Sequence, residues 1–416
     1  MSTKNAIVLG GVANHIPLIK KLQERGYKVI LVDYLPNPPA KESADEHVQI
    51  STFDEDAILE LARERGVSLI VNCCLEYLNE IAARVSETLG LPEFYSSEIA
   101  RNVSDKSCMK RIMVENGVPT SRYVDVESLS DDAISGLNFP YFVKPADGSG
   151  SNGVLRAENK EELERAFTNA LAFSRSKRTI IEEEAPGLEC NVYCYVLHGE
   201  ARVLLISAKY SEIHSELHRN TKCIGTYAPA PIASGARLEI GKVAQSIADG
   251  FRIDSSPMFM QVMVDDDRVS VIEFACRVPG GYGYRSVLSK LDFDYFDFSL
   301  DVLMRVAHEP CIADTGEISV VHSFYASPGI IGSIEGVDEL IGDGTIVDAN
   351  LERREGSRVS VESCNREKVG QFVIAADSPE EAISKIRRFF EVVQVRDTEG
   401  SDMLRRDLTL EAAITQ

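Results

Sequence analysis

The sequence predicts an α/β protein with a parallel sheet at its N-terminus, followed by a larger region that mixes antiparallel strands with helices. Over roughly the first hundred residues, apolar stretches of strand length alternate with amphipathic helical patterns, which is typical of a parallel sheet covered on both faces. After residue 200 the pattern becomes strand-rich and includes an antiparallel hairpin. From about residue 310, further strands and one late helix indicate a mixed C-terminal region.

The first domain is expected to span residues 1–100. Its predicted strands and helices alternate along the chain, and each strand is a short apolar run. The strands are predicted at residues 6–9, 27–32 and 69–74, and the helices at residues 16–25, 53–65 and 80–89.

The second domain, residues 101–310, should begin with an amphipathic helix over residues 104–117. Ser104 is the expected N-cap of this helix, and Gly117 followed by Pro119 signals its end. Further strands are predicted at residues 141–144, 179–182 and 191–197, helices at 160–173 and 238–250, and a hairpin at 257–264 and 268–275. A third domain, residues 311–416, should contain a helix over residues 378–390 with Pro379 in its first turn.

Length, charge and cysteine content exclude several classes of protein. At roughly 100–200 residues per domain, 416 residues correspond to about two to four domains. The 65 acidic and 44 basic residues give a net charge of −21, which disfavours nucleic acid and anionic membranes as partners. No apolar run approaches the ~18–20 residues of a membrane span, and the N-terminal apolar stretch is too brief for a signal peptide. Nine cysteines without a CxxC pair indicate reduced thiols, so we expect a cytoplasmic protein.

The first glycine motif, Gly10-Gly11, follows a strand and precedes a helix, and Asp33 closes the next strand. This order resembles a dinucleotide site. The second and third glycines that such a site needs are, however, replaced by Val12 and His15. We therefore favour an α/β domain without a nucleotide over an NAD-binding domain.

The second glycine motif comes directly after the strand that ends at Lys144. Its members are Gly148, Ser149, Gly150, Ser151, Asn152 and Gly153. Glycines let successive amides turn into one concavity, small side chains let phosphate oxygens approach, and the lysine adds positive charge. The pattern GxxxxGK[ST] is absent, so this is no Walker P-loop, and a flexible surface loop is the alternative interpretation.

An acidic segment at the end of a predicted strand has the sequence Glu182-Glu183-Glu184-Ala185, followed by Pro186 and Gly187. Its backbone between Glu183 and Ala185 can pair with the edge of an adenine, and Glu189 can accept hydrogen bonds from ribose hydroxyls. The alternative is a solvated strand edge.

The predicted hairpin carries Gln261 and Glu273. If Asp265, Asp266 and Asp267 form a three-residue turn, Gln261 lies opposite Val271, and Glu273 is its diagonal neighbour on the same face. Both side-chain oxygens can then reach one hard cation. A two-residue turn would instead place the two side chains on opposite faces and remove the argument.

Four residues after Glu273, Arg277 can stabilise charge that develops on a transferring phosphoryl group or a tetrahedral intermediate. The amides of Gly280 and Gly281 can assist, and Arg285 can hold a substrate carboxylate in bidentate fashion. A surface arginine is the alternative interpretation of Arg285.

In this order and spacing, the motifs resemble the ATP-grasp superfamily of carboxylate–amine ligases. The matching landmarks are Ser104-Asp105-Lys106 with Lys110, Phe139 to Pro145 with its glycine motif, Glu182 to Glu189, and Glu273 to Arg277. Residues 359–385 are similar to the C-terminal cap of the biotin-carboxylase-like branch. The resemblance implies a Rossmann-like N-terminal domain, a two-part α+β ATP-grasp domain with a mobile lid at about residues 121–198, and an α+β cap.

The resemblance also implies a role for each motif. Lys106 and Lys144 would contact ATP phosphates under the glycine motif, while the segment 182–185 would frame adenine and Glu189 would hold ribose. Gln261 and Glu273 would bind Mg²⁺, or Mn²⁺ in its place. Arg277 would stabilise an acyl phosphate and is, with Lys144, the expected catalytic residue.

Two departures qualify this assignment. The family commonly reads Glu-x-Asn-x-Arg, and here Ala275 takes the Asn place, so a second Mg²⁺ would have one protein ligand fewer.

His214 and His218 are four residues apart, but Glu216 is in the third position, whereas HExxH needs it in the second. We favour a polar loop near the acceptor substrate over a zinc site, with Lys209 or Arg219 as a contact for a substrate carboxylate.

The sequence therefore predicts an ADP-forming ligase that makes an amide or peptide bond through an acyl phosphate, with a small-molecule carboxylate and an amine, both amino acids, as substrates. The alternatives are an ATP-grasp carboxylase or formyl transferase that uses bicarbonate or formate, and a nucleotide-binding regulatory module without catalysis. A homodimer is common in similar proteins.

Overall fold

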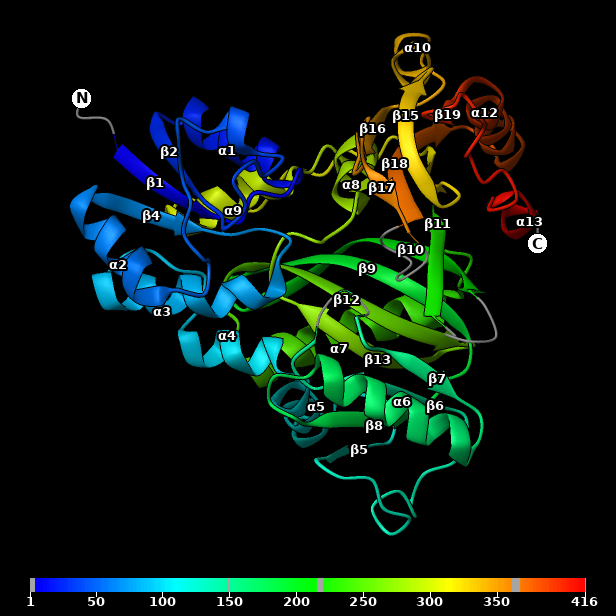
Figure 1. The fold of residues 1–416 in the computed structure, drawn as a ribbon. Helices are drawn as coiled ribbons and strands as arrows, with labels where there is room; N and C mark the ends of the chain where they lie inside the picture. The colour runs from blue at the N-terminus through cyan, green and yellow to red at the C-terminus, as the bar shows by residue number, and fades with distance from the viewer. Residues whose placement is uncertain (1–3, 149, 151, 215–219, 361–366, 416) are drawn as a thin grey trace.

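The computed structural model describes residues 4–148, 150, 152–214, 220–360 and 367–415. Its N-terminal part is a parallel sheet in the order β3-β2-β1-β4, which confirms the predicted α/β arrangement (Figure 1). The strands are β1 (Lys4–Leu9), β2 (Tyr27–Val32), β3 (Glu46–Val48) and β4 (Val67–Val71), and the helices are α1 (His15–Glu24), α2 (Glu55–Glu64) and α3 (Asn79–Leu89).

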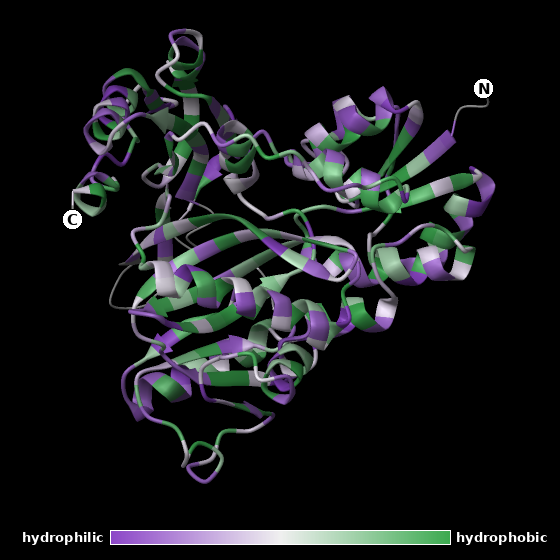
Figure 2. Cartoon of the chain, turned by 180° about the vertical axis from the view of Figure 1, so that it is seen from behind, coloured by the Kyte–Doolittle hydropathy of each residue, from purple (hydrophilic) through white to green (hydrophobic). Residues whose placement is uncertain are grey.

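Both faces of this sheet are covered. Successive side chains of β1 enter different cores: Val8 packs in the cluster that contains Leu18 of α1, and Ile7 in the cluster that contains Ile58 of α2. Hydrophobic and hydrophilic residues alternate along the helices and along many of the strands (Figure 2).

The predicted helix over residues 104–117 is wrong at its start. Ser104 is the last residue of α4 (Ser97–Ser104), and its hydroxyl donates to the carbonyl of Ala100. The chain turns at Asp105, whose carboxylate accepts from the Cys108 amide at 3.0 Å and caps α5 (Lys106–Glu115). A carboxylate is as good an N-cap as a hydroxyl and also interacts favourably with the helix dipole, so Asp105 takes the capping place.

A small antiparallel sheet, in the order β5-β8-β6-β7, follows. Its elements are β5 (Tyr123–Val126), β6 (Tyr141–Pro145), β7 (Leu155–Ala157), α6 (Lys160–Phe173) and β8 (Thr179–Glu183). Helix α6 covers one face of this sheet through a core that includes Val143, Leu163 and Ile181. The lid predicted at about residues 121–198 contains this sheet, but its last residues form β9 (Leu188–Leu197) of the large sheet, so the small sheet of residues 123–183 is only part of that range.

A large sheet, in the order β13-β12-β9-β10-β11-β14-β18-β16, forms the centre of the molecule. Its strands are β9 (Leu188–Leu197), β10 (Glu200–His214), β11 (Asn220–Ala228), β12 (Ser256–Asp265), β13 (Arg268–Ala275), β14 (Ile318–Tyr325), β16 (Asp348–Leu351) and β18 (Lys368–Ala376). The associated helices are α7 (Ser234–Phe251), α8 (Gly283–Leu291) and α9 (Tyr295–Leu303). The sheet thus continues from the middle of the chain into its C-terminal region.

The C-terminal region adds a three-stranded sheet of β15 (Gly329–Glu335), β17 (Arg358–Val359) and β19 (Gln394–Asp397), with α10 (Val337–Gly342), α12 (Pro379–Val392) and α13 (Glu411–Ile414). Helix α12 begins as predicted, with Pro379 in its first turn and the Ser378 hydroxyl accepting from the Glu381 amide. None of the described helices is long and apolar enough to cross a membrane.

The turn predicted for the β12–β13 hairpin is wrong, yet the expected neighbours meet. Asp265 pairs with Arg268, so the turn has two central residues, and Asp266 takes a φ of +53° there. A β-bulge then inserts Ile272 between the Val262–Val271 pair and the Gln261–Glu273 pair. The extra residue shifts the alternation by one position, so Gln261 and Glu273 lie directly opposite each other.

Candidate active site

Three polar side chains lie side by side on one face of the large sheet. Gln261 of β12 is opposite Glu273 of β13 on one side and opposite Asn191 of β9 on the other. The Gln261 amide nitrogen donates to the Asn191 side-chain oxygen at 3.4 Å. The hairpin therefore presents an amide and a carboxylate together, as the metal-site prediction requires.

Lys106 joins this hairpin to the glycine motif. Its ammonium lies 3.3 Å from a carboxylate oxygen of Glu273 and donates to the Gly148 carbonyl at 2.7 Å. The charge of Lys106, against the opposing effect of burial, lowers the pKa of Glu273 to about 2. Glu273 is therefore ionised at neutral pH, and the glycine motif lies at the same site.

The glycine motif is fixed at both ends. Gly153 has a φ of +77°, and a Cβ there would lie 2.8 Å from Cβ of Phe173, so no other residue fits this turn. At the other end, the Asp147 carboxylate accepts from the amides of Arg175 and Ser176. Gly150 also has a positive φ. The predicted contacts Ser149 and Ser151 lie outside the described residues.

Lys144 is buried and belongs to a charged triad. Its ammonium lies 2.5 Å from one oxygen of Glu182, and the Lys110 ammonium lies 2.8 Å from the other oxygen. Burial alone would raise the pKa of Glu182, which is 5% exposed, but the two lysines lower it below its ordinary value. Glu182 thus fixes Lys144 at the end of β6.

The side chains that follow Glu182 are held by arginines. Glu183 pairs with Arg122 at 2.5 Å, and Glu184 with Arg156 at 2.7 Å. With these carboxylates paired, the backbone around Ala185 is the part of the segment left to contact a base. Glu189 lies on β9, where its carboxylate accepts from the Lys209 ammonium at 2.6 Å.

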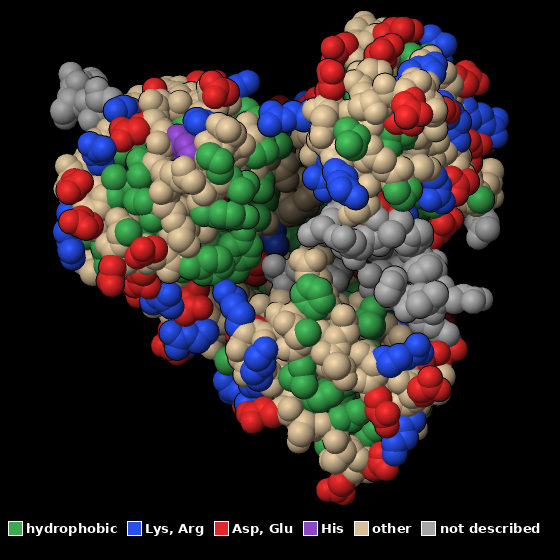
Figure 3. Space-filling view, viewed as in Figure 1, with side chains coloured by type: hydrophobic (Ala, Val, Ile, Leu, Met, Phe, Trp, Pro, Cys, Tyr) green, Lys and Arg blue, Asp and Glu red, His purple; other side chains and the backbone are tan. Residues whose placement is uncertain are grey.

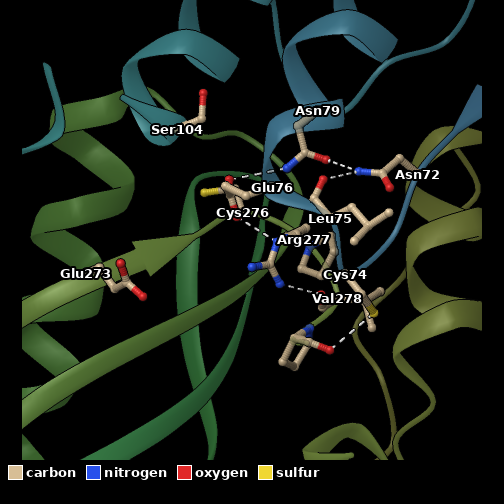
Figure 4. Close-up of polar contacts among 12 residues, drawn as sticks. Asn72, Cys74, Leu75, Glu76, Asn79, Ser104, Glu273, Cys276, Arg277 and Val278 are labelled. Carbon is tan, nitrogen blue, oxygen red and sulfur yellow. Dashed lines mark hydrogen bonds and ion pairs between the residues drawn. The ribbon is translucent and has the colours of Figure 1, made fainter. Parts of the chain in front are cut away.

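Arg277 meets the N-terminal domain through Glu76, in the short 3₁₀ turn after β4. The guanidinium Nε donates to a Glu76 oxygen at 2.6 Å, and Nη1 donates to the carbonyl of Val278 (Figure 4). Burial opposes the charged form of Arg277, but Glu76 holds the pKa of the guanidinium above its ordinary value. Arg277 is only 16% exposed at its side chain, so this contact fixes its position.

The loop after Arg277 leads to Arg285 through Gly280 and Gly281. A Cβ on Gly280 would lie 4.0 Å from Arg277 Nη1, so this backbone passes close to the guanidinium. Arg285, at the start of α8, lies 2.7 Å from the carboxylate of Asp348 in the C-terminal region. Figure 3 shows a hollow between the N-terminal domain and the C-terminal region, bordered by apolar side chains of the N-terminal domain.

The first glycine motif serves the packing of its own domain. The Asp33 carboxylate accepts from the amides of Gly11 at 2.7 Å and Leu35 at 2.8 Å, so it has partners within the fold. A Cβ on Gly11 would lie 2.5 Å from Pro38. These contacts support the interpretation of a domain without a dinucleotide.

The residues present fit a hard cation with open coordination positions. Among the described residues, no three His, Cys, Asp or Glu side chains cluster as a metal site. Gln261 and Glu273 alone would leave most positions of a Mg²⁺ for water and phosphate oxygens, which is how Mg²⁺ is usually held. Ala275 is buried on β13 and offers no ligand. Of the HSELH segment, residues 215–218 lie outside the described residues.

The sequence did not reveal several residues of this site. Asn191 belongs to an ordinary strand pattern, and Asp348, the partner of Arg285, lies in a short strand without a motif. Glu76 had one available signal, because it follows a strand of a parallel sheet, at the edge where ligands bind.

Two family models match this chain. Residues 104–280 match "Phosphoribosylglycinamide synthetase, ATP-grasp (A) domain", and residues 322–397 match "L-amino acid ligase C-terminal domain 2". The first match contains the site residues from Lys106 to Gly280, and the second contains Asp348 and Gln371.

Curated relatives are 24–28% identical to this chain over the aligned regions. A phosphoribosylamine–glycine ligase of Caulobacter vibrioides is 24% identical over 75% of this chain and 77% of its own length. The trifunctional purine biosynthetic protein adenosine-3 of Chironomus tentans is 26% identical over 58% of this chain, which spans only 19% of that protein. A formate-dependent phosphoribosylglycinamide formyltransferase of Ignicoccus hospitalis is 27% identical over 44% of this chain and 46% of its own length.

Solved structures share the whole fold. The L-amino acid ligase from Bacillus licheniformis superimposes with a TM-score of 0.77 at 19% identity, over 95% of this chain and 99% of that one. The biotin carboxylase domain dimer of the Hydrogenobacter thermophilus 2-oxoglutarate carboxylase, solved with MgADP, ADP and bicarbonate, gives 0.75 at 17% identity over 99% and 94%. The matches thus identify an ATP-grasp domain at residues 104–280 and an L-amino acid ligase C-terminal domain at residues 322–397, on a fold that these solved structures share.

Proposed function

We propose that this protein is an ADP-forming ligase that joins the carboxylate of one amino acid to the amine of another. The observation that carries the proposal is the combination of two features in one chain. Lys106 ties the glycine motif to an ionised Glu273 beside Gln261, and residues 322–397 match an L-amino acid ligase domain.

The chemistry requires activation of a carboxylate. A free carboxylate is a poor electrophile at neutral pH, and transfer of the ATP γ-phosphoryl group to it supplies a leaving group. The amine then attacks the acyl carbon, a C–N bond forms, the C–O bond to phosphate breaks, and phosphate leaves. Mg²⁺ held by Gln261 and Glu273 would neutralise part of the negative charge of the ATP phosphates.

The chain's own residues provide the rest. Lys144, fixed by Glu182, and Lys106 offer positive charge for the phosphates beneath the glycine motif. Arg277, fixed by Glu76, offers a guanidinium to the charge that develops at the acyl phosphate. The segment from Glu183 to Ala185 would contact adenine, and Glu189 the ribose.

Exclusion of water is the role proposed for the small sheet of residues 123–183. An acyl phosphate hydrolyses readily, so the site must close over it. Strand β6 of this sheet carries Lys144 and leads directly into the glycine motif. Just before the motif, the Asp147 carboxylate accepts hydrogen bonds from the amides of Arg175 and Ser176. A movement of this unit would therefore move the phosphate contacts with it.

The experiment is to supply Mg-ATP with pools of amino acids and to measure ADP, AMP and phosphate. We expect ADP and phosphate in equal amounts with a dipeptide product. AMP as the product would refute the acyl-phosphate route. Glu273→Gln should abolish turnover, because it removes the charge that holds the metal.

Relatives that use formate or bicarbonate make a second function worth testing in the same assay. The formyltransferase of Ignicoccus hospitalis covers part of this chain, and the biotin carboxylase domain was solved with bicarbonate. ADP formation that depends on formate or bicarbonate, and not on amino acids, would favour that function. Tight ATP binding without turnover on any pool would favour a regulatory module.

The homodimer implied by the resemblance stays a prediction, and light scattering tests it.

A further inference from the structure

The face of the large sheet that carries Glu273 and Gln261 continues into the C-terminal region. Residues directly opposite each other in neighbouring strands lie on the same face of a sheet, so a chain of such pairs traces one face from edge to edge. The pairs are Glu273–Gln261, Gln261–Asn191, Asn191–Ser207, Lys209–Thr226, Thr226–Val321, Val321–Val373 and Val373–Asp348. Asp348 and Gln371, two residues before Val373, thus share the face of the proposed metal site.

Gln371 has an unused acceptor on this face. Its side chain is 7% exposed, and its amide nitrogen donates to the Ser323 hydroxyl at 3.3 Å. In the part of the chain that the structure describes, its carbonyl oxygen Oε1 has no hydrogen-bond partner. A buried acceptor without a donor is costly, and such groups are rare in folded proteins.

The loop after Arg277 brings this oxygen to the reaction site. A Cβ on Gly281 would lie 3.6 Å from Gln371 Oε1, whereas one on the preceding Gly280 would lie 4.0 Å from Arg277 Nη1. Two consecutive residues of this loop therefore pass near the guanidinium and near the Gln371 acceptor. The Asn14 side chain donates to the Gly281 carbonyl at 3.0 Å and fixes this backbone from the N-terminal domain.

The polar groups near Gln371 Oε1 favour a ligand that donates hydrogen bonds. The Asp348 carboxylate faces the same loop, where Arg285 lies 2.7 Å from one of its oxygens. The side chain of Asp348 is 30% exposed, so a ligand can reach it. The Gln371 carbonyl oxygen and the Asp348 carboxylate can both accept from N–H groups, and Arg285 offsets the Asp348 charge without occupying Gln371 Oε1.

We propose that Gln371 Oε1 and the Asp348 carboxylate accept hydrogen bonds from the ammonium group of the substrate whose carboxylate is phosphorylated beside Arg277. The ligand class is an amino acid with a free ammonium group, held with its carboxylate toward Arg277 and its ammonium group toward β18. The inference rests on the proposed ligase function and names the substrate class for that same site. It excludes formate and bicarbonate as the carboxylate, because neither carries an ammonium group.

The test compares amino acids with acids that lack only the amino group. ADP release is measured with alanine against propionate, and with phenylalanine against 3-phenylpropionate, each with the same amine donor. Gln371→Met keeps the length of the side chain and removes the acceptor. We expect it to raise the KM of the amino acid about tenfold or more, with the KM of ATP unchanged.

Two further variants separate binding from folding. Gln371→Glu retains an acceptor oxygen and should restore most of the affinity for the amino acid. Gln245→Met, on α7, loses its bonds to Gly199 and Asp249 and serves as the matched control, with unchanged KM values. The melting temperature of each variant shows whether it folds.

The outcomes are distinct. No ADP release from wild-type protein with any carboxylate overturns both the proposed function and this inference. Turnover with an unchanged amino-acid KM in Gln371→Met overturns the inference and leaves the function standing. Wild-type protein that uses propionate as well as alanine also overturns it.

Discussion

Glu76 is expected to act as a positioning residue for Arg277, and Glu76→Gln tests this. The substitution keeps the size of the side chain and removes its charge. In the structure, Glu76 accepts from Arg277 Nε at 2.6 Å, and both side chains are mostly buried, at 14% and 16% exposure. A hydrogen bond to a charged group contributes about 1.5–3 kcal/mol, and the neutral amide retains part of it. A loss of about 1.4 kcal/mol in the transition state corresponds to about a tenfold lower kcat.

The assay is steady-state ADP release with saturating carboxylate and amine. Because Glu76 contacts Arg277 and none of the proposed phosphate or metal contacts, kcat should fall about tenfold while the KM of ATP stays within about twofold. Glu80→Gln is the matched control. Glu80, four residues later, pairs with Arg84 and Arg101 on the outer side of the N-terminal domain. This variant should keep its kcat.

Two results would refute this reasoning. An unchanged kcat in Glu76→Gln would mean that Arg277 holds its position without Glu76. A raised KM of ATP with unchanged kcat would mean that Glu76 acts on nucleotide binding instead. Either result counts only if the Glu76→Gln variant is full length and has an unchanged melting temperature, because this shows that it folds.

Three other predictions follow from the same contacts. Lys106→Met separates the glycine motif from Glu273, so the KM of ATP should rise about tenfold or more; an unchanged nucleotide affinity by calorimetry would contradict this. Glu182→Gln leaves two buried lysines without a counter-charge and should lower the unfolding free energy in urea by about 3–5 kcal/mol. Burial lowers the pKa of His15 and His322 to about 4 from 6.5, so the unfolded chain binds more protons between these pH values. Stability should therefore fall as pH drops from 6.5 to 4, by about 3 kcal/mol for each histidine, and His322→Gln should lose its share of that slope.

Local patterns were enough to predict the elements that local chemistry determines. Helix α12 begins where Ser378 and Pro379 indicate, and α6 spans residues 160–173 as predicted. The parallel N-terminal sheet also follows from its alternating pattern. In each case the signal lies within a few residues of the element that it specifies.

The register of the β12–β13 hairpin shows where such reasoning stops. The sequence led to a three-residue turn, whereas the structure has a two-residue turn and a bulge at Ile272. The shorter turn and the bulge each shift the pairing by one residue in the same direction, so Glu273 returns to the face of Gln261 and lies directly opposite it. A bulge depends on how the strand packs against its neighbours, so the spacing of two residues cannot reveal it.

The contacts that complete the site are those that no local pattern encodes. Glu76 and Arg277 are 201 residues apart in sequence, and Gln371 of β18 lies near Gly281 of a distant loop. In the sequence, none of these residues differs from what its own strand, turn or loop would be expected to contain. Only the arrangement of the large sheet and the N-terminal domain brings them together.

The pairing of charges also explains how an acidic protein can keep a site for an anionic nucleotide. Lys106, Lys144, Lys209 and Arg277 each contact a carboxylate: Glu273, Glu182, Glu189 and Glu76 respectively. These partners hold the cations in place, so the positive groups are pre-organised at little cost in side-chain entropy. A bound phosphate must then share each cation with its carboxylate, which favours a metal ion between Glu273 and the phosphates. Removal of Mg²⁺ should therefore weaken ATP binding far more than the loss of any single lysine.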